Sequence, residues 1–387
     1  MNVAEARALF PAATRSPYFA TNGYGLLPTT ARDAMVAALE RLADRGYGAH
    51  ARYEQAVEGV RAQVAAFVGA ASEEIGFVRN TADGLGFAAE SLPIGPGGPT
   101  ATDAHGRDEV VVFAGDYGSV VYPFLARQRR GELRVRIVDP PADGVITAES
   151  VAAAIGPRTL AVALSWVRFD SGARSDVAAI AAVCRSRDVW SIVDAIQGLG
   201  VFPLDVAEAG IDVLTAGSHK WLCGLAGLGV LYVRAERLAE LRPTRAGLDA
   251  FDHPDDYLTA GYPWTLRPVA GRVEDGAKPE VAIAGLGASL DVLATIGLDA
   301  VAAQVRAVTD RLCDGFVAAG GRVRSPRGET AWSGILSLEP PSGRDPAALA
   351  AALLADGIVL GARDGALWLG AHCYTDLGDA DRLLAHL

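Results

Sequence analysis

Residues 190–233 read WSIVDAIQGLGVFPLDVAEAGIDVLTAGSHKWLCGLAGLGVLYV, and this stretch decides the fold. Its three short apolar runs predict three buried strands, of which the first ends in Asp194. The second run leads into a glycine-rich turn that carries Lys220. Lone carboxylates and ammonium groups are rarely buried without a reason, and open α/β sheets bind their ligands at strand ends. The stretch therefore predicts a ligand site built around Asp194 and Lys220.

The chemistry of these two side chains indicates which ligand they bind. A lysine amine forms a Schiff base with an aldehyde, and a carboxylate holds a pyridine nitrogen in its protonated form. Pyridoxal phosphate carries both an aldehyde and a pyridine ring. We therefore predict a pyridoxal phosphate site, with Lys220 as the catalytic residue and Asp194 at the ring nitrogen. The alternative is a surface lysine on an ordinary glycine-rich loop.

The residues around Lys220 resemble the lysine motif of the class V aminotransferase family. In order, this motif consists of a hydrophobic residue, an acid, two hydrophobic residues, two free positions, two small residues, His and Lys. The chain has this order at residues 211–220, and Gly227, Gly229 and Leu231 follow at the positions that the family pattern requires. The large number of constrained positions makes the resemblance specific. The family belongs to the fold type I enzymes that use pyridoxal phosphate and includes cysteine desulfurases, kynureninases and isopenicillin N epimerases.

The resemblance implies an α/β fold, the fold type I transferase. Its large domain has a mostly parallel seven-stranded sheet, and a smaller α+β domain follows at the C-terminus. Independently, predicted strands and helices alternate along the chain, which indicates a mostly parallel sheet. We expect residues 15–250 to form the large domain that binds the cofactor. Residues 251–387, together with residues 1–14, are expected to form the small domain.

The composition argues against several other classes of protein. The 387 residues are 50% hydrophobic and 21% charged, which is typical of a globular protein. A net charge of −11 and the lack of a basic run argue against nucleic acid or an anionic membrane as a partner. No signal peptide or bilayer-spanning segment is predicted, and the four cysteines and six histidines show no metal-binding spacing. We expect a cytoplasmic protein without a metal.

The family resemblance assigns further residues to the cofactor. Gln197 is expected to bond the phenolic oxygen, and Trp166, within the run LSWVRFDSGARSD, is expected beside it. Tyr117 is expected to stack on the ring where relatives often have His; ordinary packing of Tyr117, with Tyr122 or Phe124 in that role, is the alternative. The resemblance also implies a homodimer with its sites at the interface. The cofactor phosphate is expected to contact Asn80, Thr81, Ala82, Ser218 and His219 of one subunit and Gly276 of the partner subunit.

Some of these assignments have a plain structural alternative. Residues 80–84 open a predicted helix, whose N-terminus either binds an anion or is merely capped by Asn80 or Thr81. Relatives carry a threonine after the glycine at position 276, but this chain has Ala277 there. One phosphate hydroxyl is therefore missing.

Near the C-terminus the chain departs from the family at the substrate-binding arginine. Many relatives read LRVSPHxYN there, but this chain reads LWLGAHCY, so Trp368 replaces the arginine that binds the α-carboxylate. Either the substrate lacks a carboxylate at that spot, or Arg363, Arg168 or Arg272 binds it, in that order. Trp368 leaves room for a bulky substrate.

The N-terminal segment also resembles a part of the family that lies near the substrate. The turn at residues 22–25 contains Asn22 and Tyr24, which are expected to approach the substrate. A plain turn is the alternative.

Cysteine desulfurases carry a nucleophilic cysteine on a loop between two substrate arginines. In this chain only four residues separate Arg363 from Trp368, which leaves no room for that loop. Cys373 is expected to pack as a small apolar residue. Persulfide transfer of the desulfurase kind is therefore not expected.

The predicted reaction is β-elimination from a bulky S-substituted cysteine, that is, a C–S lyase in a specialised or biosynthetic pathway. Lys220 would act as the base at Cα. The alternatives within the family are epimerisation, transamination and a deamination coupled to decarboxylation. A pseudoenzyme that binds pyridoxal phosphate is the alternative from another class, because Trp368 removes a substrate anchor.

Overall fold

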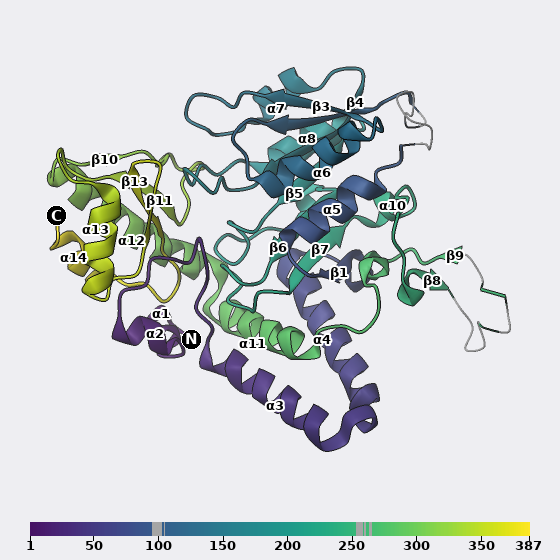
Figure 1. Cartoon of the computed structure of the whole chain (residues 1–387), viewed down its shortest axis with the longest axis horizontal. Helices are drawn as coiled ribbons and strands as arrows, with labels where there is room; N and C mark the ends of the chain where they lie inside the picture. Colours follow the sequence, from purple (N-terminus) through teal and green to yellow (C-terminus); the bar gives the residue numbers. More distant parts are fainter. Residues whose placement is uncertain (95–102, 104, 253–257, 259–260, 263–264) are drawn as a thin grey trace.

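The computed structural model describes residues 1–94, 103, 105–252, 258, 261–262 and 265–387. A seven-stranded sheet with the order β1-β7-β6-β5-β4-β2-β3 lies at its centre (Figure 1). β7 pairs antiparallel with β1 and β6, and the other neighbours are parallel, which confirms the mostly parallel sheet. The strands are β1 (Ile75–Val78), β2 (Glu109–Phe113), β3 (Arg134–Val138), β4 (Thr159–Ser165), β5 (Trp190–Asp194), β6 (Val213–Gly217) and β7 (Gly229–Val233).

Helices cover both faces of this sheet, because its central strands are apolar on both sides. On one face α5 (Thr81–Ser91) and α6 (Gly118–Arg129) pack on alternate residues of β2, β4 and β5. On the other face α7 (Ala148–Ala154) and α8 (Val177–Ser186) pack on the residues in between. The remaining helices of this part are α3 (Thr29–Arg45), α4 (His50–Val68), α9 (Val206–Ala209), α10 (Ala235–Leu238) and α11 (Glu280–Ile296).

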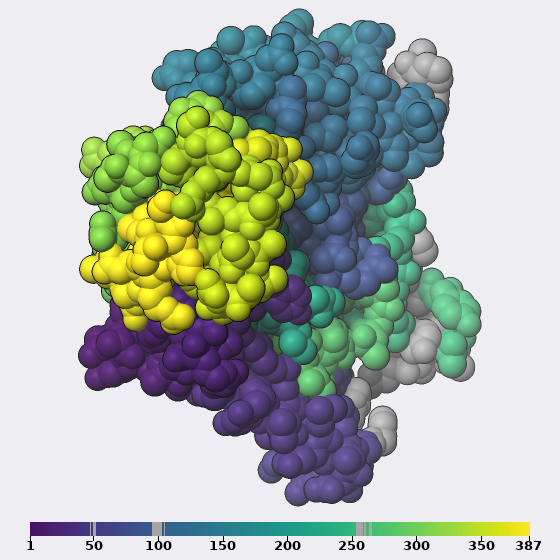
Figure 2. Space-filling view, turned by 60° about the vertical axis from the view of Figure 1, so that its left-hand side comes forward, coloured from purple at the N-terminus to yellow at the C-terminus, as the bar shows by residue number. Residues whose placement is uncertain are grey.

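A second, antiparallel sheet has the order β10-β11-β13-β12 and lies with the C-terminal helices. The N-terminal segment joins it through bridges from Tyr18 to Val359 and from Ala20 to Gly370. Figure 2 shows the yellow C-terminal residues against the purple N-terminal ones. The elements here are α1 (Val3–Arg7), α2 (Pro11–Arg15), α12 (Leu298–Ala318), α13 (Pro346–Ala355), α14 (Leu377–Leu384), β10 (Arg322–Val323), β11 (Ile335–Glu339), β12 (Gly361–Arg363) and β13 (Ala366–Gly370). A separate two-stranded sheet pairs β8 (Phe251–Asp252) antiparallel with β9 (Thr265–Leu266).

The register of the large sheet places several chain segments at one edge. Asp194, the last residue of β5, lies opposite Ser165 of β4 and Thr215 of β6. Because parallel strands end at the same edge, the segments that follow β1, β2, β4, β5 and β6 all meet there. This edge is where the polar residues singled out above converge.

Within the described residues, no single helix has the length and apolar composition to cross a membrane. α11 and α12 satisfy that test only as a pair, and they are bent by 78° relative to each other.

Candidate active site

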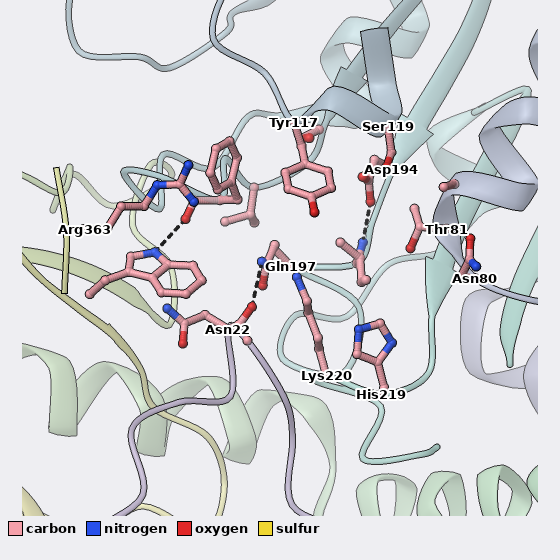
Figure 3. Close-up of a pocket in the computed structure, with 17 residues that line it drawn as sticks. Asn22, Asn80, Thr81, Tyr117, Ser119, Asp194, Gln197, His219, Lys220 and Arg363 are labelled. Carbon is pink, nitrogen blue, oxygen red and sulfur yellow. Dashed lines mark hydrogen bonds between the residues drawn. The ribbon is translucent and has the colours of Figure 1, made fainter. Parts of the chain in front are cut away.

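A cavity of about 440 Å³ lies at the carboxyl edge of the large sheet, and residues of β12 and β13 close one of its sides (Figure 3). It brings together most of the residues singled out from the sequence. Those that line it are Asn22, Asn80, Thr81, Ala82, Tyr117, Asp194, Gln197, His219, Lys220, Arg363 and Trp368.

Asp194 and Lys220 reach the cavity from neighbouring strands. Asp194 ends β5, and Lys220 follows the end of β6 by three residues. The Asp194 carboxylate accepts a hydrogen bond from the Ile196 N–H, with Oδ1 2.9 Å from that nitrogen. The two side chains therefore face one space from fixed backbone positions.

Burial shifts the pKa values of both groups toward their neutral forms. It raises the pKa of Asp194 to about 7; the hydrogen bond from Ile196 opposes this rise, and the charge of Asp116 adds to it. Burial lowers the pKa of Lys220, and the Asp194 charge offsets part of that effect. A buried carboxylate without a full partner and an amine of lowered pKa are typical of a site that awaits a ligand.

Gln197 presents a fixed amide to the cavity. The Trp221 indole N–H donates to its Oε1 at 2.7 Å, and its Nε2 donates to the Asn22 carbonyl at 3.0 Å. Because an indole nitrogen only donates, Oε1 must face Trp221, and the amide cannot be reversed. The second Nε2 hydrogen is left for a ligand, which suits an oxygen such as the phenolic oxygen of pyridoxal phosphate.

The N-terminus of α5 forms the end of the cavity that lies away from Arg363 (Figure 3). Asn80 caps the helix, because its Oδ1 accepts from the Asp83 N–H at 2.9 Å. The N–H groups of Thr81 and Ala82 lie in the first turn and have no partner within the helix. Thr81 also accepts from the Gly217 N–H at 2.8 Å, which ties α5 to the end of β6. Capping and anion binding are thus compatible here.

The aromatic side chains of Tyr117, Phe169 and Trp368 line the cavity. The Tyr117 ring lies edge-on to Phe169, with the two ring centroids 5.1 Å apart, and the Tyr117 side chain is 49% exposed. The Trp368 indole N–H donates to the Phe169 carbonyl at 2.8 Å. Since this bond satisfies its nitrogen, Trp368 offers the cavity an apolar surface.

Arg363 is the guanidinium among the residues that line the cavity. Its central carbon lies 4.5 Å from the Phe169 ring centroid, and its Nε donates to Asp364 at 3.1 Å. The stacking and the ion pair orient the fork, so its outer nitrogens can bind a carboxylate in the bidentate manner.

Two buried polar side chains at the cavity have atoms without a hydrogen-bond partner among the described residues. These atoms include both Nδ2 and Oδ1 of Asn22, although this residue is only 1% exposed. The Nδ1 of His219 is also unbonded, and burial lowers the pKa of this imidazole. Unsatisfied buried groups cost free energy, so they indicate a missing ligand or water. Together with the amine, the carboxylate and the helix N-terminus, they fit pyridoxal phosphate.

Five of the expected site residues do not line the cavity. Trp166 packs in the core against Gly198 and Phe202, and its neighbour Val167 faces the cavity instead. Tyr24 lies beside the His219 ring, and the Ser218 hydroxyl donates to the Leu225 and Leu228 carbonyls. Arg168 points away from the cavity and donates to backbone carbonyls. Gly276 lines a separate pocket. Arg272, the third arginine expected as a possible carboxylate site, is buried and donates to the Leu238 carbonyl.

Several lining residues were missed in the sequence. Val167 and Phe169 belong to the run around Trp166, and both line the cavity. Alternation along an extended segment predicts that these two residues share a face, but not which face points to the cavity. Ser165 ends β4 beside Asp194, so its position follows from the sheet register. Ser119 and Ile196 carry no signal that sets them apart from neighbouring residues.

None of the four cysteines lines the cavity, and all are buried. Burial raises the pKa of the Cys373 thiol to about 12, so it is protonated near neutral pH. A thiol acts as a nucleophile in its thiolate form, and Cys373 is therefore unsuited to that role.

Comparison with known proteins relates this geometry to one family. A family model described as aminotransferase class V matches residues 26–379. Over 249 residues the chain is 31% identical to a cysteine desulfurase from Enterobacter sp. (strain 638), and this alignment covers 64% of the chain and 58% of that relative. The match thus spans less than two thirds of the relative's length.

Two solved structures share the fold. One is a variant of the protein C-DES with glycine covalently linked to its pyridoxal phosphate, at a TM-score of 0.87 and 23% identity over 98% of both chains. The other is the cystine C–S lyase C-DES in complex with its product, cysteine persulfide, at a TM-score of 0.86 and 24% identity over 97% of this chain and 98% of that one.

Proposed function

The chain belongs to the aminotransferase class V family of pyridoxal-phosphate enzymes, and from that premise we propose that it is a C–S lyase acting on bulky S-substituted cysteines. The observation that carries the proposal is the meeting of Lys220 and Asp194 in a cavity that no cysteine lines. The first half of this observation supports chemistry at an amino acid Cα. The second half separates the reaction from persulfide transfer through an enzyme cysteine.

When bound, pyridoxal phosphate supplies an electron-accepting ring that stabilises negative charge at Cα. Three residues of this chain would hold that ring. Asp194 would accept from the protonated ring nitrogen, Gln197 would donate through Nε2 to the phenolic oxygen, and Tyr117 would lie against the ring face. The phosphate would meet the N-terminus of α5, with His219 nearby and Ser218 acting indirectly through the turn that carries Lys220.

Lys220 has two tasks in this proposal. Its amine would hold the cofactor through the aldehyde, and once the substrate amine has taken that place it would remove the proton from Cα. Burial lowers the pKa of Lys220, which favours the neutral amine that both tasks require. Its place on a short turn after β6 limits the amine to the region beside Asp194 and Gln197 (Figure 3).

Arg363 and Trp368 would define how the substrate lies. The Arg363 fork binds the substrate carboxylate, in place of the arginine that relatives carry at position 368. The Trp368 surface then faces the sulfur substituent, because the indole N–H is already bonded to Phe169. Neutral and apolar substituents are therefore favoured. Asn22 also lines the cavity, and its buried carboxamide, which has no hydrogen-bond partner among the described residues, would add polar contacts to the substrate.

The proposed reaction balances without an oxidant or reductant. Lys220 takes the proton from Cα, the Cβ–S bond breaks, and its electron pair leaves with the sulfur, which becomes a thiol after protonation. Water then replaces the nitrogen at Cα. The net change converts one S-substituted cysteine and one water into a thiol, pyruvate and ammonium.

A homodimer completes the proposal. Apolar side chains of α3 point to solvent, namely Val36, Leu39 and Leu42, which are 45%, 55% and 41% exposed. Leu42 lines a surface pocket together with Gly276 and Ala277. Such an apolar stripe supports a contact between two copies of the chain. Gly276 would then approach the partner's cofactor phosphate.

Product analysis tests the reaction. The holoenzyme and its Cys373→Ala variant would be incubated with S-substituted cysteines, and pyruvate, ammonium and thiol would be quantified. We expect the three products in equal amounts from both proteins. Loss of activity in the Cys373→Ala protein, with the fold and the cofactor retained, would instead assign the reaction to a cysteine. Racemised substrate without pyruvate would indicate an epimerase. A keto acid that keeps the sulfur would indicate a transaminase, and an amine formed together with carbon dioxide would indicate a decarboxylation.

A further inference from the structure

The Tyr117 ring is not enclosed by the part of the chain that the structure describes. The side chain is 49% exposed, and its ring meets Phe169 edge-on. An exposed ring without close packing keeps much of its rotational freedom. If Tyr117 lies against the cofactor, its direction must come from the backbone of the turn at residues 114–117, which connects β2 to α6.

Asp116 ties one side of this turn to the neighbouring strand. Its Oδ1 accepts from the Tyr117 N–H at 2.7 Å and from the Ser165 hydroxyl at 2.6 Å. Its Oδ2 accepts from the Ser165 N–H at 2.9 Å. Because Ser165 ends β4, the carboxylate fixes the Tyr117 backbone to a rigid part of the sheet.

Arg168 ties the other side of the same turn. Its Nη2 donates to the Gly115 carbonyl at 2.8 Å, and its Nη1 donates to the Ala114 carbonyl at 3.3 Å. Asp170 holds the guanidinium through Nε and Nη2, at 3.3 and 3.1 Å. Gly115 has a φ of +70°, and a Cβ at this position would lie 2.9 Å from the Arg168 Nη2. The close approach therefore depends on glycine.

We propose that Asp116 and Arg168 are positioning residues that clamp this turn from both sides and so hold the Tyr117 ring over the cofactor. The inference rests on the proposed function, because that proposal puts Tyr117 against the cofactor ring. It gives Arg168 a role different from binding the substrate carboxylate. Arg168 is buried, with 5% of its surface exposed, and its guanidinium donates to the turn and to Asp170.

A clamp of this kind has a spectroscopic consequence that a general contribution to stability lacks. The circular dichroism of the bound cofactor in its visible band reports the asymmetric contacts around the ring. Holoenzymes of the Asp116→Ala, Arg168→Ala and Tyr117→Ala variants would be compared with the wild type. Arg158→Ala is the matched control, because Arg158 pairs with Asp108 at the opposite end of β2 and β4.

The expected result is that Asp116→Ala and Arg168→Ala each change the visible band toward that of Tyr117→Ala. In both, kcat should fall by about 10-fold to 100-fold, since misplacement by about 1 Å has effects of this size, while KM changes by less than about 3-fold. Arg158→Ala should keep the wild-type band and kcat. Asp116→Asn retains an acceptor for the turn, so it should recover part of the band that Asp116→Ala loses.

Two results would overturn the inference, and they differ in what else they affect. A wild-type band and kcat in Asp116→Ala and Arg168→Ala, beside an altered band in Tyr117→Ala, would exclude the clamp and leave the proposed function intact. A wild-type band in Tyr117→Ala would remove Tyr117 from the cofactor and with it the reason for a clamp. If Asp116→Ala does not fold, Asp116→Asn and Arg168→Gln decide the question by the same two readouts.

Discussion

At the scale of single residues, Asp194 shows what the burial of a carboxylate costs the protein. Its carboxylate is buried beside Lys220, and a bound cofactor would stabilise its charge through the protonated ring nitrogen. Burial raises the pKa of Asp194 in the folded protein to about 7, against about 4 in an unfolded chain. The folded protein therefore binds this proton more tightly, and its stability falls as the pH rises from about 4 to about 7.

The Asp194→Asn variant tests this account, because its amide does not ionise. Without cofactor, the variant should melt at least about 2 °C above the wild type at about pH 8, and the difference should shrink at about pH 5. With cofactor, the order should reverse, since the amide cannot hold the protonated ring nitrogen. Thermal melting followed by far-ultraviolet circular dichroism measures both. Equal melting temperatures of the variant and the wild type at both pH values would show that burial does not raise the pKa of Asp194.

Arg363 is the second residue with a direct test. Its alanine variant should raise KM for an S-substituted cysteine by about 10-fold to 100-fold, because a charged bidentate contact contributes about 1.5–3 kcal/mol. Arg363→Lys should recover only part of this loss, since an ammonium offers no fork. Arg322→Ala removes an exposed arginine from β10, away from the cavity, and should leave KM unchanged. An unchanged KM in Arg363→Ala would exclude it as the carboxylate site.

At the scale of elements, α5 must lie close to β6 for its N-terminus to face the cavity. Gly84 permits this approach, because a Cβ there would lie 2.2 Å from the Thr215 Oγ1. Gly84→Ala should therefore shift the helix, lower the free energy of unfolding by about 1–3 kcal/mol and weaken cofactor binding. Gly86 lies on the same helix, and a Cβ there would have no atom of the described residues within 4 Å. Gly86→Ala should be neutral or stabilise by up to about 1 kcal/mol. Urea unfolding and cofactor titration measure the two effects; equal results would refute the packing argument.

The sequence predicts elements well where a pattern is local. The apolar runs around Lys220 indicate β5, β6 and β7, and the lysine motif predicts the aminotransferase class V family, whose family model matches the chain. Side-chain directions that depend on tertiary contacts are harder to predict. An extended segment alternates between two faces, and the sequence does not say that Val167 rather than Trp166 faces the cavity. The two carbonyls to which Arg168 donates, those of Ala114 and Gly115, lie more than 50 residues away in the chain, so the sequence does not predict that this side chain points away from the cavity.

At the scale of the whole molecule, the proposed dimer is testable through the exposed stripe on α3. Leu39→Glu should convert a dimer into a monomer, because a charge in an apolar contact loses its hydration. It should also weaken cofactor binding, as Gly276 of the partner subunit would be absent from the site. Val317→Glu is the matched control, since Val317 is an exposed residue of α12 with 60% exposure. Light scattering after gel filtration gives the mass. A wild-type chain that elutes as a monomer would contradict the interface.

The most direct measurement of the central claim is turnover in heavy water followed by mass spectrometry. Holoenzyme with an S-substituted cysteine should release free thiol and pyruvate that carries deuterium in its methyl group. The Lys220→Ala holoenzyme should release neither, although it remains folded. Recovered substrate with deuterium at Cα and an intact sulfur substituent, without pyruvate, would contradict the lyase. Undiminished turnover in Lys220→Ala would contradict the role of this lysine.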